Sequence, residues 1–147
     1  MRKFEKVQNI DSVKIPERST RNSAGYDFEA INDFTIMPNE VVKIPLGIKA
    51  MMNEDEVLFI LVRSSMGFTY NVRLVKQVGV IDSDYYNNID NEGHMFIRIQ
   101  NEGDKDYVMK KGEAYCQGIF IKYLTTGDKI VEVRNGGIGS TNRGSDE

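Results

Sequence analysis

Two carboxylates near the middle of the chain have a spacing suited to proton transfer. Asp82 and Asp84 lie in the segment GVIDSDYY (79–86). Side chains at positions i and i+2 of a strand project from one face, so the pattern predicts that the two acids lie side by side. A carboxylate held in an apolar setting can act as a general base on water. Ordinary acidic turns have the same composition, so the segment alone leaves both interpretations open.

The segment RSSMGF (63–68) carries groups that can hold phosphate. It directly follows the apolar run 57–62. Arg63, Ser64 and Ser65 together can donate several hydrogen bonds to phosphate oxygens. Serine and glycine are also common turn formers, so this segment is weak evidence when taken alone.

Two other segments each contain a notable polar group. In AGYDFEA (24–30), Asp27 is suited to anchor a metal-bound water or an arginine, although a simple hairpin entry has the same composition. In GEAYCQGIF (112–120), Gln117 supplies one amide among apolar neighbours. The adjacent Cys116 is interpreted as a small buried side chain and not as a nucleophile.

The C-terminal segment RNGGIGST (134–141) has the composition of a flexible phosphate clamp. Its glycines expose backbone N–H groups, Ser140 adds a hydroxyl, and Arg134 and Arg143 add charge. It lacks the Gly-Lys-Ser/Thr ending of a Walker loop. Because residues 134–147 contain a single apolar side chain, we expect this tail to be mobile until something binds it.

The elements that must position these groups have the pattern of β-strands. Residues 43–50 and 95–100 alternate large apolar side chains with other types, whereas 57–62 is apolar on both faces, as in a central strand. No segment of 12 or more residues keeps a helical apolar stripe. We therefore predict an all-β sandwich or jelly roll over residues 1–133, followed by a flexible Gly-rich tail over 134–147.

Composition narrows the classes of function. The 147 residues include 19 Lys plus Arg and 22 Asp plus Glu, and this mildly acidic balance argues against binding to long nucleic acids. One cysteine and one histidine exclude a zinc site made only of those residues. The longest apolar run is too short to span a membrane, and no secretory signal is visible at the N-terminus. A cytoplasmic setting is expected from the single cysteine.

Taken in chain order, these five segments resemble the five motifs of the trimeric dUTP pyrophosphatases, or dUTPases. The resemblance covers roughly residues 13–144, and GVIDSDY is its most specific part. It implies a jelly-roll homotrimer with active sites at subunit interfaces, closed by a C-terminal tail from a neighbour. It also implies hydrolysis of dUTP to dUMP and pyrophosphate, with Mg²⁺ held mainly by the triphosphate. The expected partners are then dUTP and copies of the chain itself, with no nucleic-acid polymer and no membrane.

The resemblance assigns roles residue by residue. Asp82 matches the carboxylate that activates water for attack on the α-phosphorus. Tyr85 matches the ring that packs on the deoxyribose and excludes a 2′-hydroxyl. Asp27 matches an aspartate near the water shell of the metal. The other matches are for substrate binding: Arg63, Ser64, Ser65 and Gly67 of the second motif, the hairpin backbone of Gly79, Val80 and Ile81 for uracil, the phosphate-side amide of Gln117, and Arg134, Ile138, Gly139 and Ser140 of the tail.

Two positions depart from the pattern of the family. Lys76 stands where an asparagine usually precedes the third motif, and Ile138 stands where the tail usually supplies an aromatic ring. We therefore expect another ring to cover uracil, with His94 or Phe96 as the candidates. Without that role, His94 is interpreted as a surface residue at a strand edge.

Two alternative functions stay open. The related dCTP deaminases share the jelly roll but need a glutamate on the strand after the third motif, and residues 95–101 contain no acid. Some phage and mobile-element dUTPases also bind regulatory proteins, and the sequence does not exclude such a partner.

Overall fold

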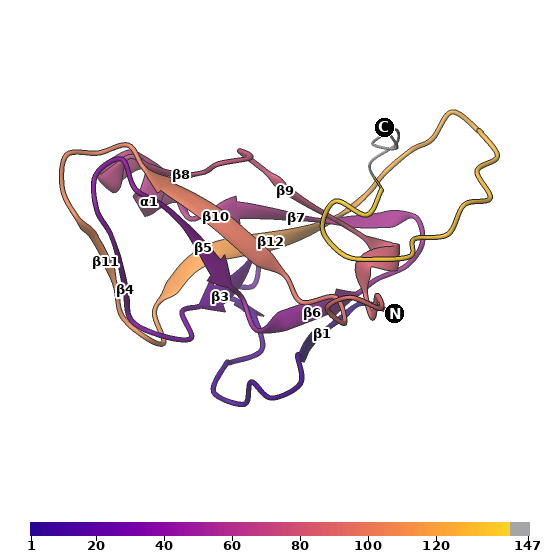
Figure 1. The fold of residues 1–147 in the computed structure, drawn as a ribbon, viewed down its shortest axis with the longest axis horizontal. Helices are drawn as coiled ribbons and strands as arrows, with labels where there is room; N and C mark the ends of the chain where they lie inside the picture. The colour runs from indigo at the N-terminus through magenta and orange to yellow at the C-terminus, as the bar shows by residue number, and fades with distance from the viewer. Residues whose placement is uncertain (142–147) are drawn as a thin grey trace.

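Strands are the main regular secondary structure of residues 1–141, the part of the chain that the computed structural model describes (Figure 1). This part contains twelve strands, one α-helix and one 3₁₀ turn. They are β1 (Lys3–Lys6), β2 (Glu17–Arg18), β3 (Tyr26–Glu29), β4 (Phe34–Ile36), β5 (Val41–Pro45), β6 (Ile48–Met51), β7 (Glu56–Val62), α1 (Ser64–Tyr70), β8 (Val72–Leu74), β9 (Gly79–Asp82), η1 (Ser83–Tyr85), β10 (Phe96–Asn101), β11 (Tyr107–Met109) and β12 (Ala114–Lys122).

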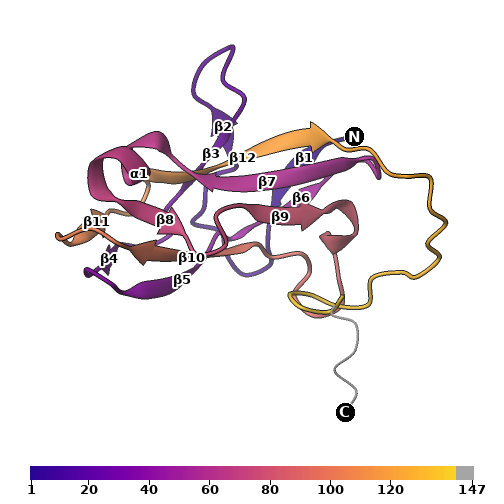
Figure 2. The ribbon, with the colours of Figure 1, turned by 90° about the horizontal axis from the view of Figure 1, so that it is seen from above.

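The strands form two facing layers. The larger sheet has the order β2-β3-β12-β7-β9, and every pair in it is antiparallel. The opposite layer contains the sheet β5-β10-β8, as Figure 2 shows, and the pairs β1-β6 and β11-β4 complete the structure. The prediction of an all-β fold is confirmed. The apolar run 57–62 is a central strand as predicted, because β7 lies between β12 and β9.

Alternating side chains from both layers fill the core. Phe28 of β3 and Leu58 and Ile60 of β7 are at most 1% exposed, and they face Ile97 and Ile99 of β10 in one apolar cluster. Burial of each such side chain contributes about 1.5–3 kcal/mol. The period of two along β10 leaves the intervening side chains on the outer face of the sheet, which is where the site lies.

The alternating run 43–50 is two strands and not one. Residues 41–45 pair with β10, whereas residues 48–51 pair with β1. The chain changes partner at Gly47, whose φ of 71° lies in the left-handed region that glycine adopts without strain. The alternation itself continues through the break, since Leu46 is 1% and Ile48 0% exposed.

A short helix replaces the turn that the residue types at 63–68 suggested. Helix α1 has seven residues and ends at Tyr70, and its C-cap Asn71 adopts the left-handed conformation with φ 57°. No side chain caps its N-terminus, and among its residues only Met66 is buried. The helix is shorter than the periodic patterns that identify helices in a sequence.

The C-terminal segment leaves the sheet and then returns to the molecule. Residues 123–133 form no strand, and Leu124, Val131 and Val133 are each at least 85% exposed. Residues 134–141 then lie beside β9 and η1 (Figure 1). Positions 142–147, which include Arg143, lie outside the described residues. Within residues 1–141 no helix is long and apolar enough to cross a membrane.

Candidate functional site

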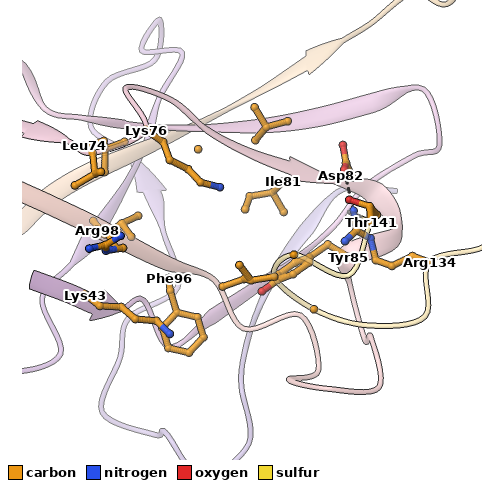
Figure 3. Close-up of a pocket in the computed structure, with 17 residues that line it drawn as sticks. Lys43, Leu74, Lys76, Ile81, Asp82, Tyr85, Phe96, Arg98, Arg134 and Thr141 are labelled. Carbon is orange, nitrogen blue, oxygen red and sulfur yellow. Dashed lines mark hydrogen bonds and ion pairs between the residues drawn. The ribbon is translucent and has the colours of Figure 1, made fainter. Parts of the chain in front are cut away.

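A cavity of about 370 Å³ lies between β9, η1 and the C-terminal segment (Figure 3). Its lining brings together residues that are far apart in the sequence. They are Gly79, Val80, Ile81, Asp82 and Tyr85 of the third segment, Arg134, Gly137, Ile138, Gly139 and Thr141 of the C-terminal segment, and Lys43, Leu74, Val75, Lys76, Phe96, Ile97 and Arg98 from the β5-β10-β8 sheet and the turn after it.

Arg134 joins the two acids of the third segment. Its Nη2 lies 2.9 Å from Asp82 Oδ2, and its Nε lies 2.8 Å from Asp84 Oδ1. The two carboxylates do not share a strand face as predicted, because β9 ends at Asp82 and Asp84 lies in η1. Asp82 does not lie in an apolar setting, since its side chain is 57% exposed. The side chain of Arg134, in contrast, is only 9% exposed. Because it has little contact with water, the two carboxylates are what balance its charge.

Tyr85 forms a rigid wall of the cavity. Its side chain is 6% exposed, and the Arg134 guanidinium lies 5.7 Å from the centre of its ring. The hydroxyl donates to the backbone oxygen of His94 at 2.8 Å and accepts from Asn91 Nδ2 at 2.8 Å. Burial raises the pKa of Tyr85, so the hydroxyl stays protonated and keeps its donor role.

Three cations line the side of the cavity opposite Asp82 (Figure 3). Lys43 and Arg98 stand directly opposite each other on β5 and β10, and Lys76 comes from the turn between β8 and β9. Like charges in a cross-strand pair cost stability, so this wall is suited to electron-rich groups of a ligand. Sequence reasoning missed Lys43 and Arg98. The sequence does contain a signal for Arg98, because it lies two positions after Phe96 in a predicted strand and therefore shares a face with that ring.

The two candidate rings occupy different positions. Phe96 lines the cavity, with Lys43 Nζ 4.5 Å from the centre of its ring. His94 packs behind Phe96 with a ring separation of 4.2 Å and is not part of the lining. The surface interpretation of His94 is wrong, because it is half-buried and its Nε2 accepts the Gly47 N–H at 2.9 Å. Burial lowers its pKa, which favours the neutral ring that this bond requires.

A second cavity of about 470 Å³ gathers the other candidate residues. It is lined by Asp27, Arg63, Ser64, Ser65 and Gln117, together with Ser19, Ser23, Ala24, Gly25 and Ile119. Arg63 Nε lies 3.5 Å from Asp27 Oδ1, and Arg63 Nη1 donates to the backbone oxygen of Ala114 at 3.2 Å. The guanidinium is therefore held at the mouth of a polar cavity with hydroxyls beside it, an arrangement suited to phosphate oxygens.

Close packing fixes the amide of Gln117 in this cavity. Gln117 lies on β12 directly opposite Asp27 of β3, and its Nε2 donates to the backbone oxygen of Val62 at 3.3 Å. A Cβ added to Gly25 would lie 2.2 Å from Gln117 Oε1. The glycine of the AGYD segment is therefore required by the close approach of this amide. Cys116 beside it is fully buried, and burial raises the pKa of its thiol.

Two predicted residues lie beside the cavities without lining them. Gly67 borders a separate hollow over α1, which Arg63 and Ser64 also line. Ser140 Oγ lies 3.4 Å from Arg134 Nη1 and so contacts the site through that arginine.

The two cavities lie at different positions on the same sheet. Asp82 pairs with Val57 of β7, whereas Asp27 pairs with Gln117, which pairs with Leu61 of β7. The two acids are therefore four residues apart along the strands and three strands apart across the sheet. At about 3.3 Å per residue and 4.8 Å per strand, this separation is roughly 20 Å. Within one chain, the two sets of residues cannot reach the same phosphorus atom.

Comparison with known proteins identifies the family to which this chain belongs. The dUTPase family model matches residues 11–146. The chain belongs to the dUTPase family. A deoxyuridine 5′-triphosphate nucleotidohydrolase from Lactococcus lactis subsp. lactis (strain IL1403) is 46% identical over 146 residues, which cover 96% of this chain and 97% of that protein.

Solved dUTPase structures share the fold. The dUTPase from Streptococcus mutans has a TM-score of 0.77 and 37% identity, and the match covers 86% of this chain and 99% of that one. A dUTPase from phage phi11 of S. aureus, which coordinates a structural Mg(II) ion, has a TM-score of 0.73 at 18% identity, over 90% of this chain and 97% of that one. The jelly roll predicted for this dUTPase is therefore confirmed.

The donor set of this dUTPase fits a magnesium ion that arrives with a phosphate ligand. Among residues 1–141, no group of three or more His, Cys, Asp or Glu side chains is arranged to hold a metal ion. Magnesium in proteins is often bound through one or two carboxylates plus the phosphates of a substrate. Asp27 supplies one carboxylate beside the side chains suited to phosphate in the second cavity.

Proposed function

We propose that this chain hydrolyses dUTP to dUMP and pyrophosphate in an active site assembled from half-sites of different subunits. The observation that carries the proposal is the division of the motif residues between two cavities, whose acids Asp82 and Asp27 lie roughly 20 Å apart. One cavity has groups for a base, a sugar and a proton transfer, and the other has groups for phosphate. A second copy of the chain supplies the complementary half.

Asp82 is the general base in this mechanism. In the structure its carboxylate is paired with Arg134. The triphosphate competes for this arginine because it offers several anionic oxygens, and the released carboxylate then accepts a proton from the attacking water. A positioned base of this kind contributes about 10²–10⁴-fold to the rate. The water attacks the α-phosphorus, and pyrophosphate leaves.

The second cavity holds the phosphates. Arg63, Ser64, Ser65 and Gln117 of one subunit donate to oxygens whose charge grows in the transition state, and Arg134 joins them from the tail. Bound Mg²⁺ would neutralise charge on the triphosphate, with Asp27 beside its water shell. Fixed donors are worth more here than in water because the closed tail excludes solvent.

The first cavity selects the nucleoside. Strand β9 is at the edge of its sheet, so its outer N–H and C=O groups are free to pair with uracil in the manner of a neighbouring strand. The fixed ring of Tyr85 packs on the deoxyribose and leaves no room for a 2′-hydroxyl. Phe96 is the candidate to stack on the base, and Lys76 is positioned to donate to a base carbonyl.

Mixing two inactive variants tests the division of the site. In a trimer with shared sites, Asp82→Asn and Arg63→Ala chains combined in equal amounts and reassembled regain about one quarter of the wild-type sites by chance pairing. In a site built within one chain, every site would carry one defect and no activity would return. Pyrophosphate release by the separate and mixed variants decides between these outcomes.

Substrate preference tests the activity itself. Pyrophosphate release from dUTP should exceed release from UTP, dCTP and dTTP, and it should require Mg²⁺. Asp82→Asn should lower kcat far more than it raises KM, because the amide cannot accept the proton. Near-normal kcat in this variant would remove Asp82 from its role. Ammonia release from dCTP is not expected, since β10 carries no acid.

The cellular setting is the last part of the proposal. The only cysteine, Cys116, is a free buried thiol, and we expect the enzyme to act in the reducing cytoplasm. The regulatory protein partner stays a prediction, which capture of a specific host protein on the immobilised trimer would test.

A further inference from the structure

The loop between η1 and β10 contacts the C-terminal segment directly. The backbone N–H of Gly137 donates to Asp90 Oδ2 at 2.7 Å. No sequence motif assigned a role to residues 87–93, which form a polar stretch of mainly Asn, Asp and Glu. The contact joins residues 47 positions apart. It is therefore a tertiary contact and not part of a local turn.

The two surfaces fit closely at the glycines of the tail. A Cβ added to Gly136 would lie 2.5 Å from Asp90 Oδ2, and one added to Gly137 would lie 3.1 Å from Asn91 Nδ2. Neither glycine has a positive φ, so backbone conformation does not explain their presence. A Cβ at either position would press on a side chain of the loop, so the two glycines allow the loop to approach the tail backbone closely.

The same loop holds Tyr85 from the other side. Asn91 Nδ2 donates to the hydroxyl of Tyr85 at 2.8 Å, and Asn88 Nδ2 donates to its backbone oxygen at 2.8 Å. Asn88 Oδ1 in turn accepts the backbone N–H groups of Asp90 and Asn91 at 3.0 and 3.2 Å. One network of hydrogen bonds therefore connects Asp90, which accepts from the tail, to Tyr85, whose ring lies beside Asp82.

We propose that residues 87–93 form a docking platform for the C-terminal segment, and that Asp90 is a positioning residue for catalysis. Asp90 holds Gly137, which places Arg134 over Asp82 and Tyr85. The platform thus fixes the position of the tail relative to Tyr85, the ring that we assign to the deoxyribose. This proposal rests on the proposed function, because its kinetic test uses the hydrolysis of dUTP.

A double-mutant cycle separates docking from simple support of the fold. Asp90→Ala should lower kcat/KM by about 10-fold or more in the full chain, as expected for loss of a hydrogen bond to a charged group. Asp90→Asn should retain more activity than Asp90→Ala, since its carbonyl oxygen still accepts although the charge is gone. In a chain that ends at Val133, Asp90→Ala should change the residual kcat/KM by less than about twofold.

An equal loss in both backgrounds would overturn the proposal, because the loop would then act on Tyr85 alone. Asp104→Asn is the matched control, since Asp104 is an exposed carboxylate in the turn between β10 and β11 and should leave activity unchanged. Failure of the wild-type enzyme to release pyrophosphate from dUTP would contradict the proposed function instead.

A cross-link tests docking without activity. The Cβ built on Gly136 lies 3.4 Å from Asp90 Cγ, so Asp90→Cys combined with Gly136→Cys places two thiols in reach of each other. Oxidation should join them, and non-reducing electrophoresis tells whether the tail docks on its own subunit or a neighbour. Either product supports the platform. Two free thiols after oxidation, in a folded protein, would overturn it.

Discussion

The close approach of Gly25 to Gln117 allows the effect of one added methyl group to be worked out from the structure. A Cβ on Gly25 would lie 2.2 Å from Gln117 Oε1, 3.1 Å from Cδ and 3.2 Å from Cβ of that side chain. The Oε1 contact is about 1 Å shorter than van der Waals packing tolerates. The amide must therefore rotate away, whereas the Cβ of Gln117 can move only with β12.

Gly25→Ala should cost little stability and much activity. Rotation gives up the hydrogen bond to Val62 and strains the side chain, which amounts to about 1–2 kcal/mol. In a protein of this size, the melting temperature then falls by about 2–8 °C. The displaced amide no longer reaches phosphate, and loss of a hydrogen bond to a charged group lowers kcat/KM by about 10–100-fold.

The assay compares Gly25→Ala, Gln117→Ala and the double variant in thermal unfolding and in pyrophosphate release. The double variant should be no less active than Gln117→Ala, because the clash disappears with the amide. Wild-type kcat/KM in Gly25→Ala would refute the reasoning. So would a double variant whose loss equals the product of the two single losses.

Other parts of the site give further expectations. Tyr85→Ala should lower the ratio of dUTP to UTP efficiency by about 10–100-fold, whereas Tyr85→Phe keeps the ring and should retain the preference; an unchanged ratio in the alanine variant would assign discrimination elsewhere. Phe96→Ala should raise KM for dUTP by about 10-fold through lost stacking, and Ile138→Phe should be tolerated; an unaltered KM in Phe96→Ala would leave Ile138 alone to cover the base. The pKa of His94 is lowered by burial, so the stability it contributes is complete above pH 6.5 and is lost as the pH falls below that value. Urea midpoints between pH 7.5 and 5.5 should therefore fall more in the wild type than in His94→Gln, whose amide oxygen still accepts the Gly47 N–H; equal falls would contradict this origin.

Local patterns predicted the faces of the strands but not their partners. The period of two in residues 95–100 correctly predicts that Ile97 and Ile99 are buried in the core, whereas Phe96 and Arg98 between them are more exposed. The same period runs unbroken through Gly47, although the chain changes from one sheet to another there. Alternation records burial on one face, and it contains no information about which strand lies alongside.

The missed features of the candidate site depend on contacts between distant residues. The composition of the tail indicated mobility, but Arg134 meets two carboxylates that lie 50 and 52 positions away. The setting of Asp82 could not be predicted for the same reason, since its partner Arg134 belongs to the tail. The sequence assigned no role to the loop at 87–93, because its amides bond to Tyr85 only in the folded chain.

The pairing of the central strand β7 limits where residues can be inserted into or deleted from this enzyme. Val57 near one end of β7 pairs with Asp82, and Leu61 near the other end pairs with Gln117, so β7 fixes the positions of these two site residues along the sheet. Deletion of a single residue between them would turn the core side chains outward and shift one half-site by about 3.3 Å relative to the other. Insertions in residues 124–133 change only how far the tail reaches, because that segment pairs with no strand. Functional variants should therefore differ in length within residues 124–133, whereas the number of residues from Val57 to Leu61 stays constant.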